Sequence, residues 1–99
     1  MPFKQDTYDP CTADVAVWGE EFQIRMCQEE LAEAVAVLNQ YLRGRKTKDD
    51  VAEELADSEI VLQEMRRIFD PTTINNIKKQ KLTRLRKRIE EAINNEVLS

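Results

Sequence analysis

The sequence predicts an all-α fold, and three observations lead to this prediction. Only two of the 99 residues are glycine and three are proline, whereas 34% are charged. Good helix formers such as Glu, Leu, Ala, Lys and Arg are abundant. Apolar residues also recur at the three- and four-residue spacing of amphipathic helices. We therefore expect a single all-α domain over residues 1–99.

The first helix is expected over residues 12–43. It follows a leader of residues 1–11, which contains two prolines, shows no periodicity and is expected to be loosely ordered. Thr12 is the expected N-cap of this helix, because a threonine hydroxyl can accept a hydrogen bond from the first turn. Gly44 is the expected C-cap.

The second helix is expected over residues 47–69. Thr47 followed three residues later by Asp50 resembles a capping box, although Glu or Gln is the usual partner. The Asp-Pro pair at 70–71 ends this helix, and a third helix is expected over 73–96. The short turn before residue 47 makes the first two helices an antiparallel hairpin.

Composition excludes several classes of function. The chain has no histidine, which removes Ser-His and Cys-His catalysis and every His-ligated metal site. Its two cysteines, Cys11 and Cys27, cannot form a disulfide framework and suit a reducing compartment. We see neither a secretory signal nor a stretch of ~20 apolar residues that could span a bilayer. The expected location is the cytoplasm, with no membrane partner.

The two predicted hairpin helices share a sequence pattern. Residues 29–38 read EELAEAVAVL and residues 53–62 read EELADSEIVL, with six of ten positions identical. Successive helical residues are rotated by about 100°. This rotation predicts a main apolar stripe on each helix that forms the core, together with a second apolar arc. The second arcs comprise Val15, Phe22, Met26 and Val37 on the first helix, and Val61 and Ile68 on the second. The main stripes comprise Ile24, Cys27, Leu31, Ala34, Val35, Leu38 and Leu42 on the first helix, and Val51, Leu55, Ser58, Leu62, Met65 and Phe69 on the second.

Each hairpin helix also carries a pair of carboxylates within its second apolar arc. Glu30 and Glu33 form the first pair, and Glu54 and Asp57 form the second. Residues three apart share a helix face, and the antiparallel hairpin brings the two faces together. Four close carboxylates repel one another unless a cation neutralises them. A hard divalent ion with oxygen ligands, Mg²⁺ or alternatively Mn²⁺, is the natural neutraliser.

The combined pattern ExxE, a 20-residue spacer and ExxD resembles the MazG-like all-α nucleoside triphosphate pyrophosphohydrolases. The WGEE segment at residues 18–21 and the KLTRL segment at residues 81–85 are also similar to this family. The resemblance covers roughly residues 14–88. It implies an enzyme that cleaves the α–β phosphate bond of an NTP or dNTP, giving the monophosphate and pyrophosphate. A related possibility is phosphoribosyl-ATP pyrophosphohydrolase, which shares the fold and the bond cleaved.

The resemblance also implies roles for individual residues. Those matching the metal ligands of the family are Glu30, Glu33, Glu54 and Asp57, which would hold Mg²⁺. Glu29 and Glu53, which precede the ligands, are candidate catalytic residues that orient the attacking water or a second ion, and Glu29 is the stronger of the two. Displacement at phosphorus depends mainly on positioning and charge neutralisation, so the absence of histidine is compatible with this chemistry.

Other candidate site residues are basic or aromatic. Lys78 and Lys81 lie within the apolar face of the third predicted helix and Arg84 borders it, and we expect these three to bind phosphate oxygens or shield the carboxylates. Trp18 and Phe22 lie two to three turns before Glu30. They could pack in a core, or they could stack on the base of a nucleotide.

Two apolar arcs on each hairpin helix require more covering surface than three helices provide. We therefore expect a second chain to complete a four-helix-bundle-type assembly, as a homodimer or homotetramer. The resemblance, to a family of two- and four-chain assemblies, points the same way.

Two alternatives to an enzyme are considered. One is a non-catalytic helical interaction module, in which the glutamates are surface charge and the second arcs form an assembly interface. The other is a nucleic-acid-binding protein that uses the basic third helix, for example through Lys79, Arg86 and Lys87. Residues 1–70 carry 8 basic and 16 acidic side chains, and this acidity argues against the second alternative.

Overall fold

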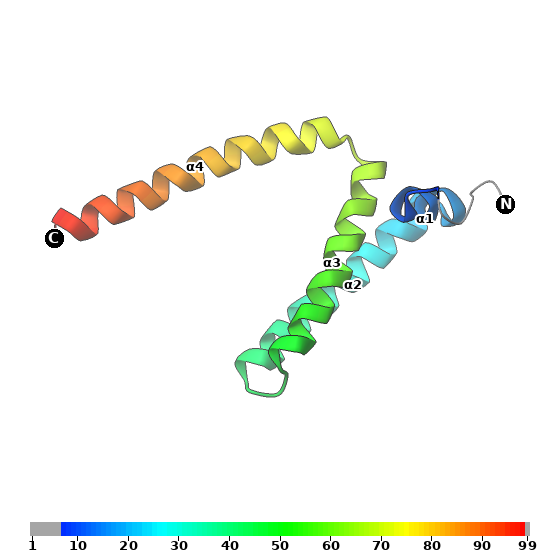
Figure 1. Ribbon diagram of the computed structural model, residues 1–99, viewed down its shortest axis with the longest axis horizontal. Helices are drawn as coiled ribbons and strands as arrows, with labels where there is room; N and C mark the ends of the chain where they lie inside the picture. Colours follow the sequence, from blue (N-terminus) through cyan, green and yellow to red (C-terminus); the bar gives the residue numbers. More distant parts are fainter. Residues whose placement is uncertain (1–6, 99) are drawn as a thin grey trace. The chain divides into compact units, whose positions relative to one another are not determined.

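Four helices make up the part of the chain that the computed structural model describes, residues 7–98 (Figure 1). They are α1 (Pro10–Trp18), α2 (Glu20–Leu42), α3 (Lys48–Ile68) and α4 (Pro71–Leu98). No strand occurs among these residues, so the all-α prediction is confirmed. None of the described helices is long and apolar enough to cross a membrane.

The helix expected over residues 12–43 is two helices, because Gly19 interrupts it. Gly19 has φ 89° and ψ 161°, a backbone conformation that only glycine adopts readily. The chain therefore changes direction between α1 and α2. The long helix predicted from periodicity was wrong here, because spacing alone does not register a glycine whose backbone leaves the helical region.

The N-terminus of α1 lies earlier than expected. Asp9, and not Thr12, is its N-cap, and the Asp9 carboxylate accepts hydrogen bonds from the Cys11 amide at 3.4 Å and the Thr12 hydroxyl at 2.7 Å. Pro10 fills the first helical position, where no amide donor is needed. The leader expected up to residue 11 thus already belongs to α1 from Pro10 onward. Its first six residues lie outside the described part of the chain.

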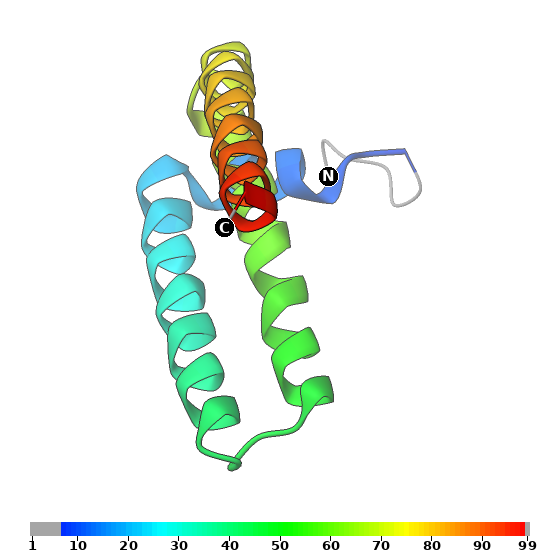
Figure 2. The same cartoon turned by 90° about the vertical axis from the view of Figure 1, so that its left-hand side faces the viewer.

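Helices α2 and α3 form the expected antiparallel hairpin (Figures 1 and 2). Gly44 adopts a φ of 76° just after α2, in the left-handed region that ends many helices. The capping box of α3 is confirmed: the Thr47 hydroxyl accepts from the Asp50 amide at 3.1 Å, and the Asp50 carboxylate accepts from the Thr47 amide at 2.8 Å.

The chain divides into two compact units, of which the first ends at Phe69 and the second begins at Asp70. The second unit contains α4, which begins at Pro71 and not at residue 73. The Asp70 carboxylate accepts hydrogen bonds from the Thr72 amide at 3.1 Å and the Thr73 hydroxyl at 2.6 Å, so Asp70 caps this helix. The single domain expected from the length stays a prediction.

Within the first unit, small and polar residues occupy the buried face between the helices. The buried residues are Ala13 on α1, Gln23, Cys27, Ala34 and Val37 on α2, and Ser58, Val61 and Glu64 on α3. The core predicted from the two main stripes is therefore only partly correct. Their small members are buried, but Leu31 is 39% exposed, Leu55 46% and Leu62 48%. The helices instead meet through smaller side chains, which allow close approach, and through the faces that carry Glu30 and Glu54.

An ion pair links α1 to α3 at the end of the hairpin away from its loop. The Arg67 guanidinium lies 2.6 Å from the Asp9 carboxylate and also donates to the Thr12 hydroxyl at 3.2 Å. The Arg67 hydrogen bond lowers the pKa of Asp9 from 3.8 to about 2. This contact holds the N-terminus of α1 against the C-terminal turns of α3.

Candidate metal centre

Three of the four predicted metal ligands converge between α2 and α3. Oxygen atoms from the carboxylates of Glu30, Glu33 and Glu54 all lie within 4.8 Å of one another. Glu30 and Glu33 are one turn apart on α2, and Glu54 faces them from α3. The hairpin loop is short enough to align these turns, which are close to equidistant from it.

This cluster is partly removed from water. Glu30 and Glu54 are half-buried, whereas Glu33 is exposed. The Oε2 atoms of Glu30 and Glu54 are each buried without a hydrogen-bond partner. Buried carboxylate oxygens normally have partners, so each of these atoms has an unfilled bonding position.

The electrostatics of the cluster are unfavourable for ionised carboxylates. Burial raises the pKa of Glu30, and the charges of Glu33, Asp57, Glu54 and Glu29 raise it further. Burial likewise raises the pKa of Glu54, with additional contributions from Glu33, Asp57 and Glu53. Both effects penalise the charged form, and a bound cation would relieve them.

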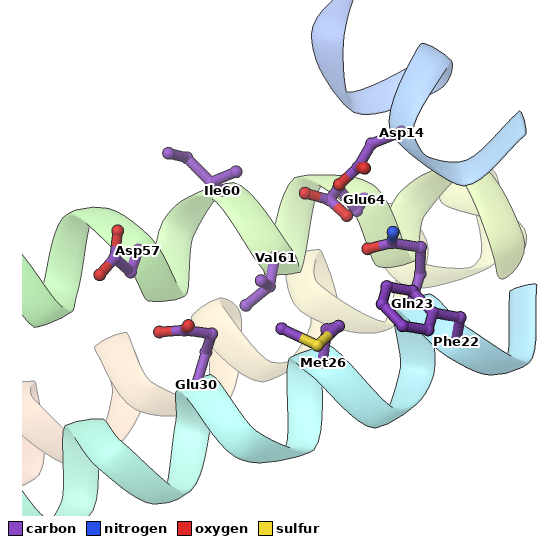
Figure 3. A pocket seen from close by; sticks show the side chains of 9 residues that line it. All are labelled: Asp14, Phe22, Gln23, Met26, Glu30, Asp57, Ile60, Val61 and Glu64. Carbon is purple, nitrogen blue, oxygen red and sulfur yellow. The ribbon is translucent and has the colours of Figure 1, made fainter. Parts of the chain in front are cut away.

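Asp57, the fourth predicted ligand, lies at the edge of the cluster. Its side chain is exposed, and it lines a groove of about 290 Å³ together with Glu30 (Figure 3). Asp57 is not one of the three residues whose oxygen atoms meet within 4.8 Å. Its charge nevertheless contributes to the raised pKa values of both Glu30 and Glu54.

The two candidate catalytic residues lie beside this centre. Glu29 and Glu53 are both exposed, and neither belongs to the three-carboxylate cluster. Each raises the pKa of the adjacent glutamate through its charge, Glu29 that of Glu30 and Glu53 that of Glu54.

The aromatic candidates are only partly associated with the site. The rings of Trp18 and Phe22 are 5.8 Å apart between centroids, with their planes tilted by 35°. Phe22 lines the same groove as Glu30 and Asp57, but Trp18 does not. Trp18 is 61% exposed and Phe22 47%. The expectation that these two side chains pack in a core is therefore wrong.

The basic candidates belong to the second unit. Lys78, Lys81 and Arg84 are exposed residues of α4. Lys78 and Lys81 lie beside apolar residues of that helix, among them Leu82 and Leu85, as the sequence predicted. Their approach to the carboxylate cluster stays a prediction.

Sequence reasoning missed a second polar group in the groove. Gln23 and Glu64 are almost fully buried, at 2% and 4% exposure, and both line the groove with Asp14. Burial, a hydrogen bond with Asp14 and the charge of Asp14 raise the pKa of Glu64 from 4.5 to about 7. Spacing could have identified them, because Gln23 lies two turns before Glu30 and Glu64 lies two turns after Asp57, on the same helix faces.

Comparisons with known proteins give no match, whether with protein-family models, curated proteins or solved structures. The interpretation of the candidate site therefore rests on its own chemistry. Its three clustered carboxylates provide only hard oxygen ligands, which suit Mg²⁺, Mn²⁺ or Ca²⁺ better than a soft transition metal.

Proposed function

We propose that the chain is a divalent-cation-dependent nucleoside triphosphate pyrophosphohydrolase of the MazG-like kind. The observation that carries the proposal is the convergence of Glu30, Glu33 and Glu54, with two buried carboxylate oxygens that lack partners. Glutamates on an ordinary surface have their carboxylate oxygens in water. In this cluster, by contrast, two of the oxygens are buried and the carboxylates repel one another. The motif spacing that predicted the cluster also carries the resemblance to this family.

The proposed roles follow from position. Glu30, Glu33 and Glu54 would hold Mg²⁺, with Mn²⁺ as a substitute, and Asp57 would complete the ligand set from the groove side. When bound, the ion would neutralise the carboxylates and polarise the phosphoryl oxygens of the substrate. Glu29 is placed beside Glu30, where an exposed carboxylate could accept a proton from the attacking water.

The exposed apolar residues of the hairpin support self-association as part of this proposal. Leu31, Leu38, Leu55 and Leu62 are between 39% and 48% exposed. Helical rotation turns Leu55 and Leu62 of α3 away from the groove, and it places Leu31 and Leu38 on a side of α2 about 80–100° from Glu30. We propose that a second copy of the chain covers these residues, to form a homodimer or homotetramer that completes a helical bundle. The same exposed face is what a non-catalytic helical interaction module would present, and activity decides between the two.

A nucleotide panel tests the function. The full chain is incubated with each NTP and dNTP in Mg²⁺ or Mn²⁺, and pyrophosphate and monophosphate are measured together. We expect both products in equal amounts, and loss of at least about 100-fold in rate for Glu30→Gln and Glu54→Gln. Glu59→Gln, an exposed glutamate of α3, is the matched control. If no nucleotide releases pyrophosphate and the cluster variants bind Mn²⁺ as the parent does, the proposal is wrong.

A further inference from the structure

The groove extends along the hairpin beyond the carboxylate cluster. Glu30 and Asp57 line one end, and Asp14, Gln23 and Glu64 line the other (Figure 3). The spacing of seven residues on each helix, from Gln23 to Glu30 and from Asp57 to Glu64, separates the two polar groups by ~10 Å at 1.5 Å per residue. Between these ends the groove is lined by apolar side chains, among them Met26 and Val61.

The far end of the groove contains an unsatisfied hydrogen-bond acceptor. Glu64 is only 4% exposed, and its Oε2 atom has no hydrogen-bond partner. The carboxyl groups of Glu64 and Asp14 lie side by side (Figure 3), and the hydrogen bond between them uses the proton that lies between the two groups. The remaining oxygens of this pair can therefore only accept hydrogen bonds.

The walls of the groove are suited to a flat apolar ring. Phe22 presents an aromatic side chain, Met26 a polarisable thioether, and Val61 a branched apolar group. A planar heterocycle would contact these walls with its faces and reach the Asp14–Glu64 pair with one polar edge. The opposite end of the same molecule would then point toward Glu30 and the metal centre.

We propose that the Asp14–Glu64 end of the groove selects nucleotides whose base carries an exocyclic amino group, with Glu64 and Asp14 accepting hydrogen bonds from it. This inference rests on the proposed function, because that function identifies the ligand as a nucleotide. An amino group supplies two N–H donors and satisfies the Glu64 Oε2 atom. Uracil, thymine and hypoxanthine present a carbonyl oxygen at the same position, and it would face acceptor oxygens with no donor between them.

Nucleosides without phosphates or metal test this selection separately from hydrolysis. The full ¹⁵N-labelled chain is titrated with deoxycytidine and deoxyuridine, which differ at the amino position, and chemical-shift changes are followed by NMR. We expect deoxycytidine to bind at least about tenfold more tightly. A parallel pair, deoxyadenosine and deoxyinosine, shows whether the groove accepts a purine.

Variants of Glu64 provide the decisive control. Glu64→Gln keeps a carbonyl acceptor and can donate its amide N–H to Asp14, so it should retain the preference for deoxycytidine. Glu64→Leu should bind both nucleosides equally, and circular dichroism checks that it is folded. Glu59→Gln should behave as the parent. Equal binding of the two nucleosides by the parent, or an unchanged preference in Glu64→Leu, would overturn the inference.

The outcomes also separate this inference from the proposed function. Pyrophosphate release without any difference between dCTP and dUTP or between dATP and dITP would refute base selection and leave the enzyme intact. A preference for deoxycytidine in a chain that hydrolyses no nucleotide would refute the enzyme and support the base site.

Discussion

At the scale of single residues, Glu64 illustrates how burial changes an acid. Its folded pKa of about 7, against 4.5 for an ordinary glutamate, arises first from burial and then from Asp14. The titratable groups near it on the neighbouring helices are Asp14 and Cys11 on α1 and Cys27 on α2. Burial raises the pKa of both thiols, and the charge of Glu64 raises it further. Among the described residues no cationic group contributes to the shift of Glu64, so its ionisation works against folding.

The sign of this effect gives the first prediction. Between pH 4.5 and 7 the unfolded chain releases the Glu64 proton while the folded chain keeps it, so stability falls as pH rises. Replacing Glu64 with Gln should remove this dependence and raise the free energy of unfolding at pH 8 by roughly 3 kcal/mol, the order of magnitude that corresponds to the pKa shift. Urea denaturation of both chains at pH 5 and pH 8 measures it. If the difference in free energy of unfolding between the parent chain and Glu64→Gln is the same at pH 5 and pH 8, the prediction is wrong.

Neutralising the carboxylate cluster, either by a bound cation or by mutation to an amide, should stabilise the fold. The raised pKa values of Glu30 and Glu54 mean that their charged forms destabilise the metal-free fold. Glu30→Gln and Glu54→Gln should therefore raise the melting temperature without metal and lose the stabilisation that Mn²⁺ gives the parent chain. Differential scanning calorimetry with and without Mn²⁺ measures both effects. Glu59→Gln should leave both unchanged, and equal Mn²⁺ stabilisation in all three variants would refute the site.

At the scale of elements, the sequence predicted the helices better than their ends. The α2–α3 hairpin and the Thr47–Asp50 capping box were predictable, because turn and cap chemistry is local. The break at Gly19 was not predictable, because a single glycine among regularly spaced apolar residues can also be accommodated inside a helix.

The buried face of the hairpin was predictable only in part. Both main stripes are rich in leucine, but it is their smaller members, such as Ala34 and Ser58, that are buried. Val37 and Val61, which are also buried, come from the second arcs. Periodicity ranks positions by hydrophobicity, whereas the close approach of two helices favours the positions with small side chains.

The candidate site was predictable to a similar extent. Glu30, Glu33 and Glu54 meet as their spacing indicated, because a one-turn pair and an antiparallel neighbour suffice to place them. Gln23 and Glu64 were missed although their spacing places them on the helix faces of Glu30 and Asp57, because periodicity does not show how deeply each polar residue of a face is buried.

The Gly19 junction yields a prediction at this scale. Its φ of 89° with ψ of 161° lies in a region that side-chain-bearing residues avoid, although a Cβ added there would meet no atom within 4 Å. Gly19→Ala should therefore destabilise the fold by about 1–3 kcal/mol through backbone strain alone. Thermal unfolding measures the loss, with Ala16→Gly in the adjacent turn of α1 as a control for helix propensity. An unchanged melting temperature for Gly19→Ala would show that α1 and α2 are not joined in this way.

At the scale of the whole molecule, each of the two units carries exposed apolar residues. In the hairpin, the exposed apolar residues include Leu55 and Leu62 of α3 and Leu31 and Leu38 of α2. The exposed apolar residues of α4, each between 45% and 54% exposed, are Ile77, Leu82, Leu85, Ile89 and Ile93. Large contiguous apolar patches on a protein surface are typical of interaction sites.

Self-association is therefore predicted to depend on the hairpin surface. The double substitution Leu55→Glu and Leu62→Glu should shift the chain from a dimer or tetramer to a monomer in sedimentation velocity, because it places charges in the proposed interface. Ala56→Glu, which adds a charge at an exposed position of the same helix about 100° away from this stripe, is the control. A parent chain that sediments as a monomer at all accessible concentrations would contradict the proposed assembly.

The proposed hydrolytic centre is tested most directly by ³¹P NMR of a reaction between the full chain, Mg²⁺ and dCTP. We expect the three triphosphate resonances to be replaced by those of dCMP and pyrophosphate, and Glu54→Gln to prevent the change. Appearance of dCDP and orthophosphate would show cleavage at a different bond. An unchanged spectrum for dCTP and for every other nucleotide tested would contradict the claim that the clustered carboxylates of Glu30, Glu33 and Glu54 form a hydrolytic centre.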